Sequence, residues 1–237
     1  MVEGYFITGT DTGVGKTAVT ASLLLWYRHR GLDAGTMKPV ETGVDPECHS
    51  AANSDACFLM EAGELRDAPD EVCLFRFKTP AAPWQAAMEE GRDAVDLDRI
   101  VSTFGRLSER HDRMLVEGIG GLMVPLTPDR TVADLAGLLK LPLILVTRYT
   151  LGTQNHTLLT VEQARSRGLA LAGLVFNQTE PGPLSEVEQK QPSLLSQWTG
   201  LPVLAELPFL ENPGTESWTP EALRAAGGVL NLDLLEP

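Results

Sequence analysis

An apolar run, a glycine-rich loop and an amphipathic run follow one another in residues 5–17, YFITGTDTGVGKT. Phosphate-binding loops have the same order of strand, turn and helix, with the spacing G-x-x-x-x-G-K-[ST]. Here the first glycine is Gly9 and position 10 is Thr10, so the spacing is one residue longer, G-x5-G-K-T. The pattern predicts a nucleotide-binding loop with a variant turn. The alternative is an ordinary strand-to-helix turn that carries an exposed lysine.

The chemistry expected of this loop comes from its backbone and from two side chains. Backbone N–H groups of residues 13–18 are expected to point at phosphate oxygens, and the start of the following helix adds positive partial charge. Lys16 is expected to reach the β- and γ-phosphates, and the Thr17 hydroxyl to bind Mg²⁺. The candidate nucleotide-binding residues of the loop are Gly13, Val14, Gly15, Lys16, Thr17 and Ala18.

Short apolar runs alternate with longer amphipathic runs along the chain. Strands are expected at residues 4–9, 33–40, 113–118, 141–148, 169–177 and 201–207, with a weaker candidate at 72–77. Helices are expected at residues 15–30, 53–62, 81–91, 96–110, 131–140, 152–167 and 184–199. Alternation of this kind predicts an α/β fold with βαβ units around a parallel sheet. No boundary is apparent, so residues 1–237 are expected to form a single domain.

The composition limits the classes of partner and the cellular compartment. A formal net charge of −13 makes general binding to nucleic acid or to an anionic membrane surface a poor expectation. Three cysteines, Cys48, Cys57 and Cys73, form no C-x-x-C pair, which argues against a disulfide scaffold or a cysteine zinc site. The first residues show no signal peptide, and the apolar run LPLILV is too short to span a membrane. A cytoplasmic protein is expected.

Charged side chains stand at or near the ends of several expected strands. Lys38 stands at the end of the expected strand 33–40, and Glu117 ends another before the glycines of VEGIGG, 116–121, which include Gly118. In open α/β sheets ligands bind at the carboxyl ends of the strands, so Lys38 is expected close to Lys16. Glu117 and Asp55 are candidate Mg²⁺ carboxylates. Taken alone, a solvated lysine, an acidic loop residue and an ordinary helix-capping NSDA segment explain the same residues.

Two further segments are candidates for ligand binding. Gly152 and Thr153, in TLGTQNH, open an expected helix, and their N–H groups could bind a carboxylate. Asn177 ends an expected strand and carries both a donor and an acceptor, which suits the edge of an adenine. The alternatives are an ordinary helix start and a turn asparagine.

Together these segments resemble one known family. YFITGTDTGVGKT, KPVETG, NSDA, VEGIGG, LGTQNH, LAGLVFNQ and ELPFLEN occur in the order and at the spacing of dethiobiotin synthetases. The segment FKTPAAPWQAA also resembles the F-x-x-P-x-x-P-x-x-A-A stretch of that family. The resemblance extends from residue 4 to about residue 213, and the longer G-x5-G-K-T loop is typical of the family.

The resemblance implies a fold and a reaction. It implies a three-layer fold of the P-loop NTPase type with a central, mostly parallel, seven-stranded sheet, in a homodimer. It implies an ATP-dependent cyclo-ligase that uses Mg²⁺ and acts on 7,8-diaminononanoate (7,8-diaminopelargonic acid) and CO₂. An amine captures CO₂ as a carbamate, ATP phosphorylates the carbamate, and the second amine closes the ureido ring of dethiobiotin with release of phosphate.

The resemblance also implies roles for individual residues. Lys16 and Lys38 would neutralise the γ-phosphate and the carbamate as the catalytic pair. The implied Mg²⁺ ligands are Thr17, Asp55 and Glu117, and the last two, with Gly118, are counted in the ATP site. Thr42 would touch the carbamate or the diamine, and Gly152, Thr153 and Asn155 would bind the substrate carboxylate across the dimer interface. Asn177 and the backbone around Pro208 would frame the adenine.

Two positions depart from the family pattern, and three other classes compete with it. Gly13 stands where some members carry an acidic residue, and Gln178 where many carry aspartate. A P-loop switch ATPase of the partitioning type would carry a lysine at or beside position 10, which is Thr10 here. A cobyrinate-type amidation domain would be joined to a glutaminase domain, for which 237 residues leave no room. A regulatory nucleotide-binding module without turnover is disfavoured by the presence of Lys38, Asp55 and Glu117 together.

Overall fold

The computed structural model describes residues 3–47, 50–211 and 214–235. Cys48 therefore lies outside the described residues. No helix among these residues is long and apolar enough to cross a membrane.

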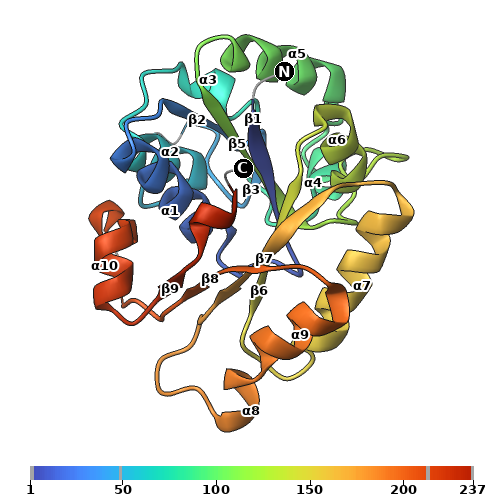
Figure 1. The fold of residues 1–237 in the computed structure, drawn as a ribbon. Helices are drawn as coiled ribbons and strands as arrows, with labels where there is room; N and C mark the ends of the chain where they lie inside the picture. The colour runs from blue at the N-terminus through green and yellow to red at the C-terminus, as the bar shows by residue number, and fades with distance from the viewer. Residues whose placement is uncertain (1–2, 48–49, 212–213, 236–237) are drawn as a thin grey trace.

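The central sheet has seven strands in the order β2-β5-β1-β6-β7-β8-β9. The strands are β1 (Glu3–Gly9), β2 (Ala34–Met37), β5 (Arg113–Gly121), β6 (Leu143–Arg148), β7 (Leu171–Asn177), β8 (Val203–Leu207) and β9 (Val229–Leu230). Every neighbouring pair is parallel except β8 and β9. The expected α/β fold with a mostly parallel seven-stranded sheet is confirmed (Figure 1).

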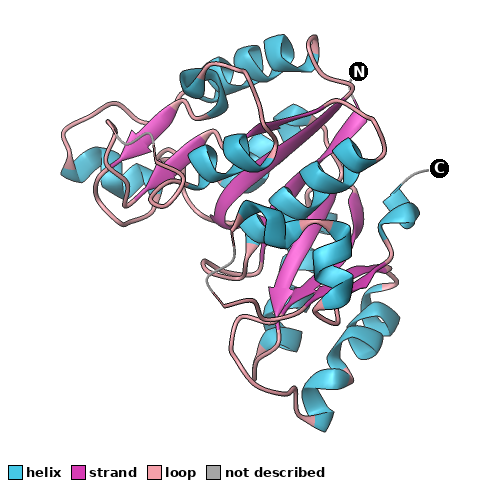
Figure 2. Ribbon diagram, turned by 90° about the vertical axis from the view of Figure 1, so that its left-hand side faces the viewer, coloured by secondary structure: helices cyan, strands magenta, loops and turns pink. Residues whose placement is uncertain are grey.

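Ten α-helices are found among the described residues, and three of them have six residues or fewer. They are α1 (Lys16–His29), α2 (Asp55–Ala62), α3 (Pro69–Val72), α4 (Pro83–Glu89), α5 (Leu97–Ser108), α6 (Val132–Leu139), α7 (Thr153–Ser166), α8 (Glu186–Gln189), α9 (Gln191–Thr199) and α10 (Pro220–Ala225). Two 3₁₀ turns, η1 (Thr215–Trp218) and η2 (Leu232–Leu235), flank α10 and β9. Figure 2 shows helices on both sides of the magenta strands.

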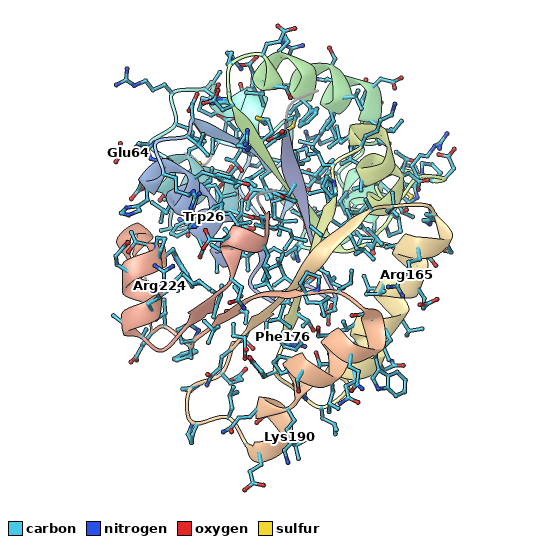
Figure 3. The ribbon with its side chains drawn as sticks, viewed as in Figure 1. Trp26, Glu64, Arg165, Phe176, Lys190 and Arg224 are labelled. Carbon is cyan, nitrogen blue, oxygen red and sulfur yellow. The ribbon has the colours of Figure 1, made fainter. Side chains whose placement is uncertain are left out.

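Neighbouring side chains of one strand pack on opposite faces of the sheet. In β1, Phe6 belongs to the apolar cluster that includes Ile100 of α5, and Ile7 belongs to the cluster that includes Leu24 of α1. Phe176 of β7 packs in a third cluster with α7 and α9 residues, and Figure 3 places it inside the molecule, with Arg165 and Lys190 toward the outside. Burial on both faces explains why the strand sequences are continuously apolar rather than alternating.

The structure corrects two expected strands. The run at 33–40 is divided: β2 ends at Met37, and β3 (Val40–Thr42) pairs in parallel with β4 (Phe75–Phe77) in a separate two-stranded sheet. Pro39 has no N–H for a ladder, and the Lys38 amide donates to the Val72 carbonyl at 2.9 Å, so the chain leaves β5 at this point. The weak candidate at 72–77 is thus β4, and the seventh strand of the central sheet is β9.

The expected helix at 184–199 is also divided. Helix α8 ends at Gln189 and α9 begins at Gln191, with Lys190 between them and Pro192 in the first turn of α9. Proline has no N–H for the hydrogen bond that would continue α8, and it is tolerated in a first turn. Helix α9, which follows the break, lies beside α7, and α8 lies at the bottom of the view in Figure 1.

Candidate active site

The glycine-rich loop joins β1 to α1 and is shaped by two left-handed residues. Gly13 has φ 73° and Gly15 has φ 95°, a region that side-chain-bearing residues rarely adopt. A Cβ atom on Gly15 would lie 2.1 Å from Nδ2 of Asn177, so this position also lacks the space for a side chain. Helix α1 begins at Lys16, directly after Gly15 as its N-cap. The free N–H groups of its first turn therefore face the loop, as a phosphate cradle requires.

Lys16 is held inside this loop. Its side chain is nearly buried, and Nζ donates to the carbonyl oxygen of Asp11 at 3.0 Å. Burial, and after it the positive charge of Lys38, lower the pKa of Lys16 to about 8, against the opposing effect of Glu117. A phosphate group bound in the cradle would restore the preference of Lys16 for the charged form.

Lys38 follows β2 and contacts two carboxylates. Nζ lies 2.5 Å from Oε1 of Glu117 and 3.1 Å from Oδ2 of Asp55, and it also donates to the Gly118 carbonyl at 3.2 Å. Burial alone would lower the pKa of Lys38, but the two carboxylates outweigh it and hold the pKa above its usual range. Lys38 is therefore charged, although its side chain is only 4% exposed.

Glu117 lies inside β5 rather than at its end, because the strand continues to Gly121. Oε1 accepts hydrogen bonds from Lys38 and from the Thr17 hydroxyl, the latter at 3.0 Å. Oε2 is buried and has no hydrogen-bond partner among the residues that the structure describes. Burial raises the pKa of Glu117 above its ordinary value, against the attraction of Lys38. A buried carboxylate oxygen without a partner is a site where a cation would be favourable.

Asp55 is the first residue of α2, and its side chain is 49% exposed. Burial tends to raise the pKa of this carboxyl, but the nearby Lys38 outweighs it and lowers the pKa. Thr17, Asp55 and Glu117 together offer hydroxyl and carboxylate oxygens, the donors that Mg²⁺ prefers. The described residues contain no group of three or more His, Cys, Asp or Glu that could hold a metal ion by themselves. This donor set thus fits an ion that takes its other ligands from phosphate and water.

These side chains surround one cavity of about 600 Å³. The predicted site residues that line it are Gly13, Gly15, Lys16, Thr17, Lys38, Thr42, Asp55 and Glu117. They come from the loop after β1 and the first turn of α1, from Lys38 after β2, and from β3, α2 and β5. The structure thus brings together the two lysines, the three predicted metal ligands and Thr42, which are separated by up to 101 positions in the sequence.

The remaining residues predicted for the nucleotide lie beside the loop. Asn177 is buried at the end of β7, and its Nδ2 donates to the carbonyl of Val14 at 3.1 Å. Ala18 packs on the apolar cluster between α1 and the sheet. Pro208 follows β8 and is half-buried. One donor of Asn177 is already used to hold the loop, so its contribution to an adenine site is limited to its other groups.

The residues predicted for the substrate carboxylate do not line this cavity. Gly152 is the exposed N-cap of α7, with φ 90°, and Asn155 is exposed in the first turn. The Thr153 side chain is buried against Thr147 at 2.7 Å, and its N–H donates to the Thr150 carbonyl at 3.2 Å. Within one chain the structure does not bring these residues to the two lysines, and the Thr153 amide would have to give up its bond to Thr150 to bind a ligand.

One residue of the cavity, Glu41, is not among those predicted from the sequence. This residue lies in β3, is 3% exposed and lines the cavity between Lys38 and Thr42. Its signal in the sequence was an acidic residue three positions after Lys38, in the segment KPVETG. Its partners lie in α2 and after α3, so its environment depends on contacts that no local pattern reveals.

Comparisons with known proteins agree with this architecture. A family model described as an AAA domain matches residues 3–217. The ATP-dependent dethiobiotin synthetase BioD of Thermodesulfovibrio yellowstonii is 40% identical over 217 residues, which cover 89% of this chain and 90% of that protein. The protein of the same name from Anaeromyxobacter dehalogenans is 43% identical over 225 residues, 95% of this chain and 94% of its own. The one from Bacillus subtilis is 35% identical over 234 residues, 99% and 97% of the two chains.

Solved structures of similar fold have much lower sequence identity. A ParA family ATPase from Chlorobium tepidum matches with a TM-score of 0.53 and 11% identity, over 100% of this chain and 94% of that chain. The signal recognition particle receptor FtsY from Elizabethkingia anophelis, in complex with GDP, matches with a TM-score of 0.51 and 14% identity, over 87% of this chain and 57% of its own. These two likenesses show the P-loop NTPase type of fold.

Proposed function

The chain belongs to the ATP-dependent dethiobiotin synthetase family, and we propose that it converts 7,8-diaminononanoate, CO₂ and ATP to dethiobiotin, ADP and phosphate. The observation that carries this proposal is the convergence of Lys16, Lys38, Asp55 and Glu117 on one cavity beside the glycine-rich loop. Such a cavity suits a reaction in which several negative charges must be gathered in one place.

The proposed reaction has three steps. The nitrogen of one substrate amine attacks the carbon of CO₂, forms a C–N bond and loses a proton to solvent, which gives a carbamate. A carbamate oxygen then attacks the γ-phosphorus of ATP and displaces ADP. Finally the nitrogen of the second amine attacks the carbamate carbon and forms a C–N bond, the C–O bond to phosphate breaks, and the nitrogen loses a proton to solvent as the ring closes. The last step is intramolecular, so it gains from proximity without a further binding event.

The residues of the cavity are proposed to act by electrostatics and positioning. Lys16 binds the β- and γ-phosphates, and Lys38 moves from its carboxylate partners to the carbamate and the transferred phosphoryl group. Positive groups placed before the reaction stabilise the charge that develops in the transition state. Thr42, at the edge of the same cavity, is proposed to contact the carbamate or the diamine.

Magnesium is proposed to bind through Thr17, Asp55 and Glu117, and the unpartnered Oε2 of Glu117 supports this assignment. When bound, the ion would neutralise part of the charge of the β- and γ-phosphates. Because Lys38 contacts both carboxylates, its release from them is expected to accompany loading of the site.

The start of α7, the end of β7 and the segment after β8 are proposed to bind other parts of the substrates. We propose a homodimer in which Gly152, Thr153 and Asn155 of one copy bind the substrate carboxylate at the cavity of the other. This arrangement is supported by the exposure of Gly152 and Asn155 away from the cavity of their own chain. Asn177 and the backbone at Pro208 are proposed to border the adenine, since Asn177 holds the loop at Val14.

A switch ATPase of the partitioning type is the competing proposal, and ATP turnover separates the two. The family proposal expects ADP formation only when both the diamine and bicarbonate are present, with one ADP for each dethiobiotin. Hydrolysis that proceeds without the diamine, or that is stimulated by DNA or lipid, would favour the switch ATPase. Diamine-dependent turnover that yields no ring product would contradict the cyclo-ligase proposal.

A further inference from the structure

The carboxylate of Glu41 spans the gap between β3 and the first turn of α2. Oε2 accepts a hydrogen bond from the Ser54 hydroxyl at 2.8 Å, and Oε1 accepts one from the backbone N–H of Ala56 at 3.2 Å. The Ser54 hydroxyl in turn accepts the N–H of Cys57 at 3.2 Å. Two N–H groups that a helix start leaves without internal partners are thus satisfied, one directly and one indirectly, through Glu41.

Asp55 lies between the two residues that Glu41 holds. Its carboxylate is 3.1 Å from Lys38, which stands three positions before Glu41 in the same segment. The segment after β2 therefore meets the start of α2 at two points: through an ion pair at Lys38 and through hydrogen bonds at Glu41. Two contacts fix the orientation of the helix start, whereas one would leave it free to pivot.

The other residues near Glu41 do not replace Ser54 and Ala56 as hydrogen-bond donors to its carboxylate. Cys73 Sγ is 3.5 Å from Oε2, and burial followed by the charge of Glu41 raises the pKa of this thiol, so it remains a donor. Arg76, opposite Glu41 in the β3–β4 register, directs its guanidinium to Asp70 at 3.2 Å and to the Pro69 carbonyl at 3.2 Å.

We propose that Glu41 is a positioning residue that holds the start of α2 so that the Asp55 carboxylate faces Lys38 and the nucleotide-bound Mg²⁺. This inference rests on the proposed function, because Asp55 is assigned there as a metal ligand. Residues that orient a metal ligand influence metal affinity although they do not touch the ion. Glu41 is thus expected to affect the metal-dependent part of nucleotide binding and not the part that depends on the loop.

The test compares nucleotide binding with and without the metal in the variant E41Q. Glutamine keeps the size of the side chain and one acceptor oxygen, but its NH₂ group faces donors. Titration calorimetry with ADP in EDTA measures the contribution of the loop, and titration of Mg²⁺ into the ADP complex measures the metal site. E41Q is expected to keep its metal-free ADP affinity and to need at least about tenfold more Mg²⁺. E61Q, which neutralises an exposed acid of the same helix, is the matched control and should match the wild type.

A double-mutant cycle tests whether Glu41 acts through Asp55. In a D55N background the substitution E41Q should raise the Mg²⁺ requirement no further, because the ligand that it positions is already lost. Equal effects of E41Q in both backgrounds would overturn the proposal. So would an unchanged Mg²⁺ requirement in E41Q, or equal losses of metal-free and metal-dependent affinity, which a general structural role would give.

Further measurements cover a failure of E41Q to fold, and distinguish a failure of the proposed function from a failure of the role of Glu41. If E41Q does not fold, S54A removes one of the two contacts and should raise the Mg²⁺ requirement in the same direction by a smaller factor; no change there would overturn the role of Glu41. A wild-type protein that binds no ADP with or without Mg²⁺ would overturn the proposed function together with this inference. A wild type that binds normally beside an unaltered E41Q would overturn only the role of Glu41.

Discussion

The ammonium of Lys38 lies 2.5 Å from Oε1 of Glu117, and both side chains are almost completely buried. Asp55 and Thr17 contact the same pair, at Lys38 and at Oε1 of Glu117 respectively. Removing one member of a buried pair leaves an uncompensated charge, which costs more than the pair contributes. Lys38, the proposed catalytic lysine, is therefore also expected to stabilise the ligand-free protein.

Replacing Lys38 should separate these two roles. K38M is expected to abolish dethiobiotin formation and to lower the free energy of unfolding by about 3 kcal/mol, because Glu117 is left buried and unpaired. Urea denaturation of the ligand-free protein measures the second effect. The double variant K38M/E117Q should recover much of the lost stability and none of the activity. Equal stability of K38M and the wild type would contradict this description of the pair.

The lowered pKa of Lys16 affects both the stability of the fold and the uptake of protons when a nucleotide binds. The pKa in the folded protein is about 8, below the 10.5 of an ordinary lysine, so the folded protein holds this proton less tightly than the unfolded chain. Lys16 therefore disfavours folding below pH 8, and this penalty disappears as the pH rises through 8 toward 10.5.

Bound phosphate should raise the pKa of Lys16 again. Calorimetry of ADP binding near pH 9, in two buffers of different ionisation enthalpy, is expected to show net uptake of protons. At pH 7 the uptake should be near zero, since Lys16 is already charged there. K16R is the matched control, because arginine stays protonated. Absence of uptake at pH 9 in the wild type would count against a buried Lys16 beside the phosphates.

Substitutions of the two loop glycines separate the cost of backbone strain from the cost of a steric clash. G13A should cost about 1 kcal/mol of stability, because its left-handed φ is unfavourable while nothing lies near the new methyl group. G15A meets the same backbone penalty and also a contact of 2.1 Å with Asn177. It is expected to displace the Asn177 amide from Val14 and to weaken ADP binding well beyond G13A. Similar affinities of the two variants would show that Asn177 does not restrain the loop.

Substitution of Asp55, a proposed metal ligand, should change the metal requirement and leave metal-free nucleotide binding intact. D55N is expected to raise the Mg²⁺ concentration for half-maximal turnover by at least about tenfold. In D55N, Lys38 loses one carboxylate but keeps its contact with Glu117, so the loss of stability should be smaller than in K38M. An unaltered Mg²⁺ requirement would remove Asp55 from the metal site.

Most of the residues of the site could be predicted because local sequence patterns identify them. Gly15, Lys16 and Thr17 stand in one segment, and Lys38 follows β2, whose carboxyl end lies at the same edge of the parallel sheet as that of β1, with β5 between the two strands. The Glu41 contacts could not be predicted in this way. They require β3 to leave the central sheet at Pro39 and α2 to start against it, and both depend on packing between segments distant in sequence.

The errors in the fold have a similar origin. Strand β4 lies within the weaker candidate at 72–77, but β3 has three residues and β9 has two, so neither carries a pattern long enough to be recognised as a separate strand. Their strand state is fixed by partners elsewhere in the chain, as for β9 against β8. The break at Lys190 had a local signal in Pro192, which the apolar spacing on either side obscured.

The cavity of Lys16 and Lys38 is proposed to serve phosphorylation of a carbamate. Transfer of oxygen from CO₂ to phosphate tests most directly whether such a phosphorylated carbamate forms. The protein would be incubated briefly with the diamine, ATP, Mg²⁺ and ¹⁸O-labelled bicarbonate, and the phosphate analysed by mass spectrometry before the label exchanges with water. The proposed reaction transfers one labelled oxygen to each phosphate, because ring closure breaks the bond between that oxygen and the carbamate carbon. Dethiobiotin formed together with unlabelled phosphate would contradict it.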